Sequence, residues 1–309
     1  MAYTTIDDPS AHFQNVLWTG NGTAGNAVTF DGNSDMQPDF VWSKKRDGAT
    51  SHVLKDTSRG GTSNNDLHLV SNSTAAESTY ANYRMDFDSD GFTLDGVGDT
   101  GFQGSGTSMV SWSWKANGGT TSTNNDGSIT TTTQVNSDAG FSIVTWAGGG
   151  TGSLGHGLGE VPDMWIVKNR DYAVSWAIGF SDSSILGGTS NYLMLNSSSA
   201  IATYNNIWGS SPANSNTITM AGDRSVNISG DDYVAYFFKA KQGYSKFGKY
   251  TGNGNANGPF VYTGFKPAFI MLKRTNGGDG WFLLDAKRNP TNISTNSAIR
   301  VDESGAEGS

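Results

Sequence analysis

The chain has 309 residues, a formal net charge of −8 and no cysteine. With 16% charged residues, 35% hydrophobic residues and nine tryptophans it does not have the composition of a disordered protein, and without cysteine it has neither disulfides nor thiolate metal sites. The acidic balance argues against nucleic acid as a partner, because phosphate binding needs a basic stripe and the densest basic cluster is only Lys44, Lys45 and Arg46.

The composition predicts an all-β fold. The 41 glycines and the many Ser, Thr and Asn residues suit short strands joined by tight turns, whereas helix-favouring glutamate occurs only four times. Residues 1–9 lack the basic and apolar regions of a signal peptide, and the longest apolar runs, such as 234–238 and 268–272, are too short to span a membrane. We therefore expect folding in a reducing cytoplasm and no membrane insertion.

An internal repeat runs through the chain, and each copy begins with an aromatic residue followed by a glycine-rich turn, at Trp18, Trp146 and Tyr250. Some 16 to 20 residues later, each copy reaches a proline that opens an apolar run ending in lysine. These runs are Pro38–Lys44, Pro162–Lys168 and Pro267–Lys273. Proline is tolerated at the start of a strand, so each run is predicted to be a strand, and the next one begins near His52, Trp176 and Trp281, fourteen residues after the prolines.

The later parts of the repeats also correspond. The matched segments are 67–69 with 193–195 and 299–301, 91–94 with 217–220, and the closing runs Met109–Lys115 and Tyr233–Lys239. Each full copy holds about six short strands in roughly a hundred residues, as in a β-sandwich. The predicted fold is thus all-β with tandem, jelly-roll-like β-sandwich modules.

The repeat divides the chain into four parts. They are a first module with a short N-terminal arm at 1–117, a Gly/Ser/Thr/Asn-rich linker with at most one extended segment at 118–139, a second module at 140–241, and a third, incomplete module at 242–309. Nothing in the third module corresponds to the strand at Phe92 or to the closing strand. Either Phe269, Met271 and Trp281 or their opposite-face neighbours would then be exposed, so we expect this module to pack against a neighbouring chain or the chain to be a fragment.

Few residues suggest a chemical site. Asp86, Asp88 and Asp90 alternate before Gly91 as in a calcium loop, but Val97 occupies the twelfth position, where a bidentate Glu is expected, so a solvated turn is favoured over a metal site. The four histidines are scattered, and no G-x-S-x-G nucleophile turn occurs. The sequence therefore predicts no catalytic residues, no cofactor and no enzyme activity. Sequence patterns alone do not exclude a pair of facing carboxylates, as in a glycosidase.

The tryptophans on predicted strands are expected mainly in the core. Trp208 and Tyr204, on a predicted loop, are the candidates for a ligand site, where a ring could stack on a sugar.

Several motifs resemble the tail-fibre-like virion proteins of marine bacteriophages. They are the opening Met1–Pro9 with Phe13 and the Trp18 turn, then Met36–Trp42, Ser71–Thr79 and Gly243–Gly248. The resemblance covers nearly the whole chain and implies a virion structural protein, made in the host cytoplasm and active in assembly and host recognition. The alternatives are a carbohydrate-binding adhesin or polysaccharide depolymerase on the virion, or a capsid-surface decoration protein. The expected partners are the chain itself as a homotrimer with parallel chains, other virion proteins and a host surface glycan.

Overall fold

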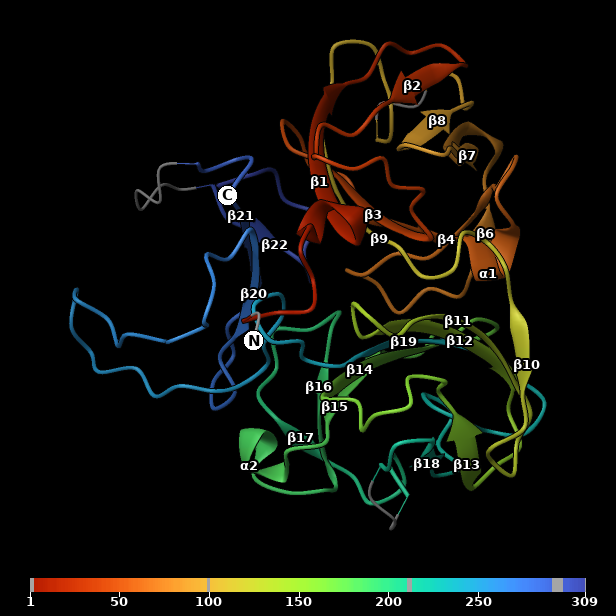
Figure 1. Ribbon diagram of the computed structural model, residues 1–309, viewed down its shortest axis with the longest axis vertical. Helices are drawn as coiled ribbons and strands as arrows, with labels where there is room; N and C mark the ends of the chain where they lie inside the picture. Colours follow the sequence, from red (N-terminus) through yellow and green to blue (C-terminus); the bar gives the residue numbers. More distant parts are fainter. Residues whose placement is uncertain (1–2, 99–100, 210–212, 291–296, 309) are drawn as a thin grey trace.

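The computed structural model describes residues 3–98, 101–209, 213–290 and 297–308 (Figure 1). These residues form antiparallel β-sheets with short helical turns, which confirms the all-β prediction. The helical elements in the described residues are η1 (Pro9–Ala11), α1 (Thr57–Gly60), η2 (Ala81–Tyr83) and α2 (Ser183–Leu186). None of them is long and apolar enough to cross a membrane.

The N-terminal part of the chain forms a four-stranded sheet and a smaller sheet that covers its outer face. In spatial order the larger sheet contains β1 (Phe13–Thr19), β9 (Ser108–Trp114), β3 (Phe40–Lys45) and β4 (Val53–Asp56). The smaller sheet contains β2 (Asn26–Val28), β8 (Phe92–Leu94) and β7 (Met85–Phe87), and β5 (Leu67–His68) pairs with β6 (Ser78–Thr79) beside them. Val41 of β3 and Phe92 of β8 are buried in the core between the two sheets.

The middle of the chain forms a larger sheet that is also covered by a smaller one. Its strands, in spatial order, are β10 (Ser122–Asn124), β11 (Thr131–Asn136), β12 (Phe141–Ala147), β19 (Asp232–Phe238), β14 (Met164–Asn169), β15 (Ala177–Phe180), β16 (Asn191–Met194) and β17 (Ala202–Thr203). A covering pair is formed by β13 (Gly152–Gly155) and β18 (Thr217–Met220). Trp165 and Ile218 belong to the core between these layers.

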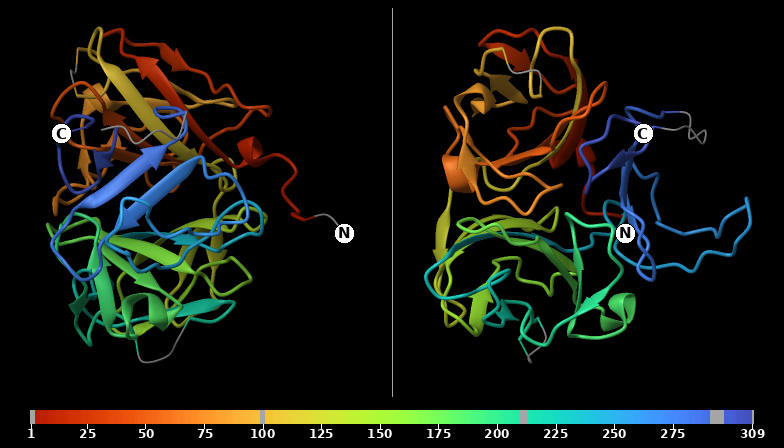
Figure 2. Two further views of the ribbon diagram at one scale, coloured as in Figure 1. Left: turned by 90° about the vertical axis from the view of Figure 1, so that its left-hand side faces the viewer. Right: turned by 180° about the vertical axis from the view of Figure 1, so that it is seen from behind.

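The C-terminal part forms a three-stranded sheet, β20 (Phe269–Lys273), β21 (Trp281–Asp285) and β22 (Ile299–Arg300). Figure 2 shows this blue sheet lying against both the red-to-yellow and the green parts of the molecule. Its buried residues Trp281 and Leu283 share one hydrophobic core with Trp112 of the first sheet and Ile166 and Tyr236 of the second. The inner faces of all three sheets therefore meet in a single common core.

This common core changes the expectation for the C-terminal part. Its inner face needs no neighbouring chain, because the first two sheets of the same chain cover it. The outer face differs, since Ile270 is 37% exposed and Leu272, Phe282 and Leu284 are only half-buried. In the described residues no second sheet covers this face.

The segment predicted to be a linker contributes two strands instead of at most one. The four consecutive threonines that begin at Thr130 run into β11, which pairs with β12 so that Thr133 lies opposite Val144. Thr131 is buried, and its Oγ1 donates a hydrogen bond to Gly155 O at 2.8 Å. β-Branched threonine fits the pleat of a strand, and its hydroxyl bonds a carbonyl, so a polar run extends the sheet.

The strand pairing differs by two residues from the expected correspondence of Leu67 with Leu193. The residues sixteen positions after the three prolines are Leu54, Ile178 and Leu283. They pair with Leu69, Leu193 and Ile299, respectively. Leu69 rather than Leu67 is therefore the counterpart of Leu193.

Candidate functional site

The three larger sheets are joined by hydrogen bonds that recur at corresponding positions. The residue fourteen positions after each proline directs its ring nitrogen to a backbone carbonyl of another sheet. The bonds join Trp176 Nε1 to Val70 O at 3.0 Å, Trp281 Nε1 to Met194 O at 2.9 Å, and His52 Nε2 to Arg300 O at 3.0 Å. The second sheet thus bonds the first, the third bonds the second, and the first bonds the third. These contacts run in a closed cycle around the common core.

His52 takes the place of a tryptophan in this cycle without losing the bond. Trp42 Nε1 donates to His52 Nδ1 at 2.9 Å, which leaves the proton on Nε2 to be donated to Arg300 O. Full burial, with Lys44 nearby, lowers the pKa of His52 to about 3. The imidazole is therefore neutral at physiological pH and serves as a fixed donor.

A buried ion network joins the first two sheets. Arg59 lies between Asp56 and Glu77, with nitrogen–oxygen distances of 2.5 Å to each, and Glu77 also accepts from Arg170 of the second sheet at 2.6 Å. Tyr236 OH donates to Asp56 Oδ2 at 2.7 Å. Burial raises the pKa of Tyr236 well above 10 although Arg59 opposes it, so the hydroxyl keeps its proton.

The same network recurs between the third sheet and the first. Arg288 contacts Asp285 at 2.6 Å and Glu307 at 3.5 Å, and Glu307 accepts from Arg46 at 2.5 Å. Trp112 Nε1 donates to Asp285 Oδ2 at 3.0 Å, as Tyr236 does to Asp56. These paired, hydrogen-bonded charges hold sheets together, which is a structural use of buried ionic groups.

The contact between the second and third sheets lacks these charges. The residues at the positions of Asp56, Arg59, Glu77 and Arg170 are, in order, Phe180, Ser183, Ile201 and Thr275. The backbone bond survives, from Ile201 N to Thr275 O at 2.9 Å, matching the bonds from Glu77 N to Arg170 O and from Glu307 N to Arg46 O. Sequence reasoning did not single out Phe180, although comparing the residues eighteen positions after each proline would have found it.

The third sheet also has an open edge. β3 and β14 each pair on both sides, with β9 and β4 and with β19 and β15. In the described residues β20 pairs only with β21. Residues 245–251, which hold the place of β1 and β12 before the glycine-rich turn, form no strand, because the closing strand that would pair with them is missing from the described sheet.

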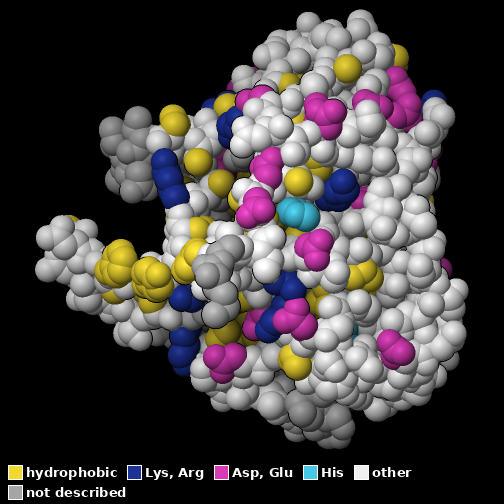
Figure 3. Space-filling view, viewed as in Figure 1, with side chains coloured by type: hydrophobic (Ala, Val, Ile, Leu, Met, Phe, Trp, Pro, Cys, Tyr) yellow, Lys and Arg dark blue, Asp and Glu magenta, His cyan; other side chains and the backbone are white. Residues whose placement is uncertain are grey.

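The segment that leads into β20 projects from the body of the molecule (Figure 1), and the space-filling view shows apolar side chains on it (Figure 3). Phe260 is 89% exposed, and Tyr250, Val261 and Tyr262 are also exposed. The outer face of the third sheet is also partly bare. Contiguous exposed apolar surface on a protein marks a surface that meets another molecule.

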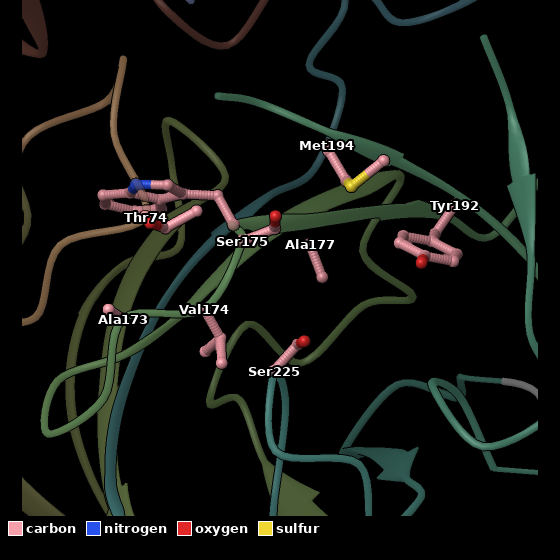
Figure 4. Close-up of a pocket in the computed structure, with 9 residues that line it drawn as sticks. Thr74, Ala173, Val174, Ser175, Ala177, Tyr192, Met194 and Ser225 are labelled. Carbon is pink, nitrogen blue, oxygen red and sulfur yellow. The ribbon is translucent and has the colours of Figure 1, made fainter. Parts of the chain in front are cut away.

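A hollow of about 270 Å³ lies beside β15 and β16 (Figure 4). Residues from both strands and from three loops line it, namely Thr74, Ala173, Val174, Ser175, Trp176, Ala177, Tyr192, Met194 and Ser225. The lining offers hydroxyls, apolar groups and the thioether of Met194, with no carboxylate, lysine or histidine. This hollow suits a small neutral group and lacks the acid–base pair that hydrolysis needs.

The three aspartates of the candidate calcium loop serve different hydrogen bonds. Asp86 Oδ1 accepts from the backbone N–H of Asn64, Asp88 Oδ2 accepts from Thr93 Oγ1 at 2.8 Å, and Asp90 Oδ1 accepts from Met36 N at 3.2 Å. In the part of the chain that the structure describes, no three His, Cys, Asp or Glu side chains are grouped to hold a metal ion. The geometry is that of the turn between β7 and β8.

The two candidate ligand aromatics lie in different environments. Trp208 is buried, packs edge-to-face on Trp165 with ring centroids 5.4 Å apart, and donates from Nε1 to Asn191 O at 3.1 Å. The Trp208 ring is therefore not exposed for stacking on a sugar, and its ring nitrogen already has a partner within the chain. Tyr204 is 49% exposed and keeps an accessible ring.

Comparison with known proteins identifies a family but no characterised relative. Neither a curated protein nor a solved structure matches the chain. The family model described as "Domain of unknown function (DUF7483)" matches residues 8–309, nearly the whole chain. The chain therefore belongs to the DUF7483 family.

Proposed function

We propose that the chain is a structural protein of a bacteriophage virion, in a tail fibre or related surface appendage, that acts in assembly and host recognition and not as an enzyme. The observation that carries this proposal is the third sheet, whose β20 edge and outer apolar face have no cover in the described residues. Open strand edges and bare apolar faces are liabilities for an isolated protein and suit a subunit that is covered on assembly. The resemblance of the N-terminal and Gly243–Gly248 motifs to phage tail-fibre-like proteins supplies the setting.

We further propose that the chain consists of three related β-sandwich, jelly-roll-like modules around one axis. Support comes from the recurring contacts at His52, Trp176 and Trp281 and from the two matching ion networks. Among the residues that the structure describes, the third module has one layer and no counterpart of the closing strand of the other two.

Self-association as a homotrimer stays a prediction and now rests on the resemblance. The aromatic side chains do not call for an interface between chains, because Trp42, Trp112, Trp176 and Trp281 are buried in the core of a single chain. Light scattering at micromolar concentration measures the stoichiometry directly.

Mass spectrometry of purified particles tests the proposal. Virions from a phage that encodes the chain should contain it in a fixed ratio to the major structural proteins after density-gradient purification. Recovery only in the soluble lysate would contradict a virion role. Shortening of host surface polysaccharide by the purified protein would favour the depolymerase alternative instead.

A further inference from the structure

The open edge of β20 presents unpaired backbone groups in a defined order. Ala286 N donates to Ala268 O at 2.9 Å, and this fixes which residues of β20 bond to β21. Because bonding alternates along an antiparallel ladder, the N–H and C=O of Phe269, Met271 and Lys273 point to the other edge. In the described residues no backbone group bonds to them there.

The first two sheets show what fills the corresponding place. β9 and β19 each have seven residues, run antiparallel to β3 and β14, and lie beside them in the same register. Their third, fifth and seventh side chains are apolar or aromatic and turn to the common core. They are Val110, Trp112 and Trp114 in β9, and Val234, Tyr236 and Phe238 in β19.

The three sheets differ at the contact made by the fifth residue of this neighbouring strand. Trp112 and Tyr236 each use a polar hydrogen to bond a buried carboxylate of the next sheet, Asp285 or Asp56. If the same pattern holds for the third sheet, the fifth residue of a strand bound beside β20 would contact Phe180. An N–H or O–H donor there would be buried without an acceptor, which is unfavourable.

We propose that the edge of β20 binds, antiparallel, a seven-residue strand of a partner polypeptide with apolar third, fifth and seventh side chains and no hydrogen-bond donor at the fifth. This inference deepens the proposed function by specifying its assembly partner. The β9 and β19 strands of a second copy of the chain do not supply this strand, because they are already paired on both sides. Strand addition to an exposed edge is an established mode of peptide recognition.

A peptide copied from β19 is the probe. It carries the sequence from Asp232 to Lys239 with Tyr236→Phe, flanked by added lysines for solubility and labelled with a fluorophore. The matched peptide keeps Tyr236, and a third carries Tyr236→Asp. Fluorescence anisotropy against the full chain should give saturable binding of the phenylalanine peptide, about tenfold weaker binding of the tyrosine peptide, and none of the aspartate peptide.

Two protein variants tie the binding to the edge. Met271→Pro removes an N–H that points to the open side and leaves the ladder with β21 intact, so it should weaken binding at least about tenfold. Met271→Ala keeps that N–H and is the matched control. Phe180→Asp supplies the missing acceptor and should reverse the preference in favour of the tyrosine peptide, with circular dichroism confirming that each variant folds.

Absence of binding, equal binding by Met271→Pro and Met271→Ala, or an unchanged peptide preference in Phe180→Asp would each overturn the inference. The presence of the chain in purified particles is a separate readout. A chain found in virions but unable to bind the peptide would refute this docking site and leave the virion role standing.

Discussion

Two adjacent leucines of β21 test whether the third sheet depends on the common core. Leu283 is fully buried in that core, whereas Leu284 lies on the opposite, half-covered face of the same strand. Leu283→Ala leaves a cavity among three sheets and should lower the free energy of unfolding by about 2–5 kcal/mol. Leu284→Ala removes the same atoms from a half-buried place and should cost about 1 kcal/mol.

Urea denaturation followed by tryptophan fluorescence and by far-ultraviolet circular dichroism measures both losses. Because the core is shared, the two signals should report a coincident transition in each variant. Equal losses for the two leucines would refute the reasoning. So would a Leu283→Ala variant in which only the C-terminal part unfolds early while the other sheets keep their stability.

Three further predictions follow from the contacts. Burial alone would raise the pKa of the Glu77 carboxyl, but Arg59 and Arg170 outweigh burial and lower the pKa below the ordinary 4.5. The free energy of unfolding should therefore fall as the pH drops below about 4.5, and Glu77→Gln should flatten that dependence in acid titrations followed by fluorescence. Trp112→Phe and Tyr236→Phe should each cost about 1–3 kcal/mol in urea denaturation, because a buried carboxylate loses a donor, and wild-type stability in either would contradict the networks. EDTA should leave the thermal midpoint unchanged; a drop of several degrees, abolished by Asp88→Ala, would instead reveal a calcium site.

The strands could be predicted from the sequence where proline and periodicity coincide. The runs after Pro38, Pro162 and Pro267 become β3, β14 and β20, and the closing runs become β9 and β19. The pairing of Leu69 could not be predicted in the same way. A shift of two residues leaves every side chain on the same face of a strand, so the apolar pattern around Leu67 and Leu69 fits both alignments equally well.

The contacts among the sheets could not be predicted from local sequence patterns. The bond from Trp176 to Val70 joins residues 106 positions apart, and that from His52 to Arg300 joins residues 248 positions apart. The burial of Trp208 against Trp165 likewise depends on how separate segments of the chain pack together, which no local pattern shows. In the part of the chain that the structure describes, no strand lies beside β20 in the place that β9 and β19 take beside β3 and β14, and the sequence comparison likewise finds no counterpart of the closing strand there.

Antibody labelling of intact particles in the electron microscope tests the central claim most directly. An antibody against the exposed segment around Phe260, or against a tag placed there, should decorate a fixed site on every virion, at the tail if the chain is a fibre component. Decoration of the capsid surface would contradict the tail assignment, and particles that contain no label under conditions that label the free protein would contradict a virion role altogether.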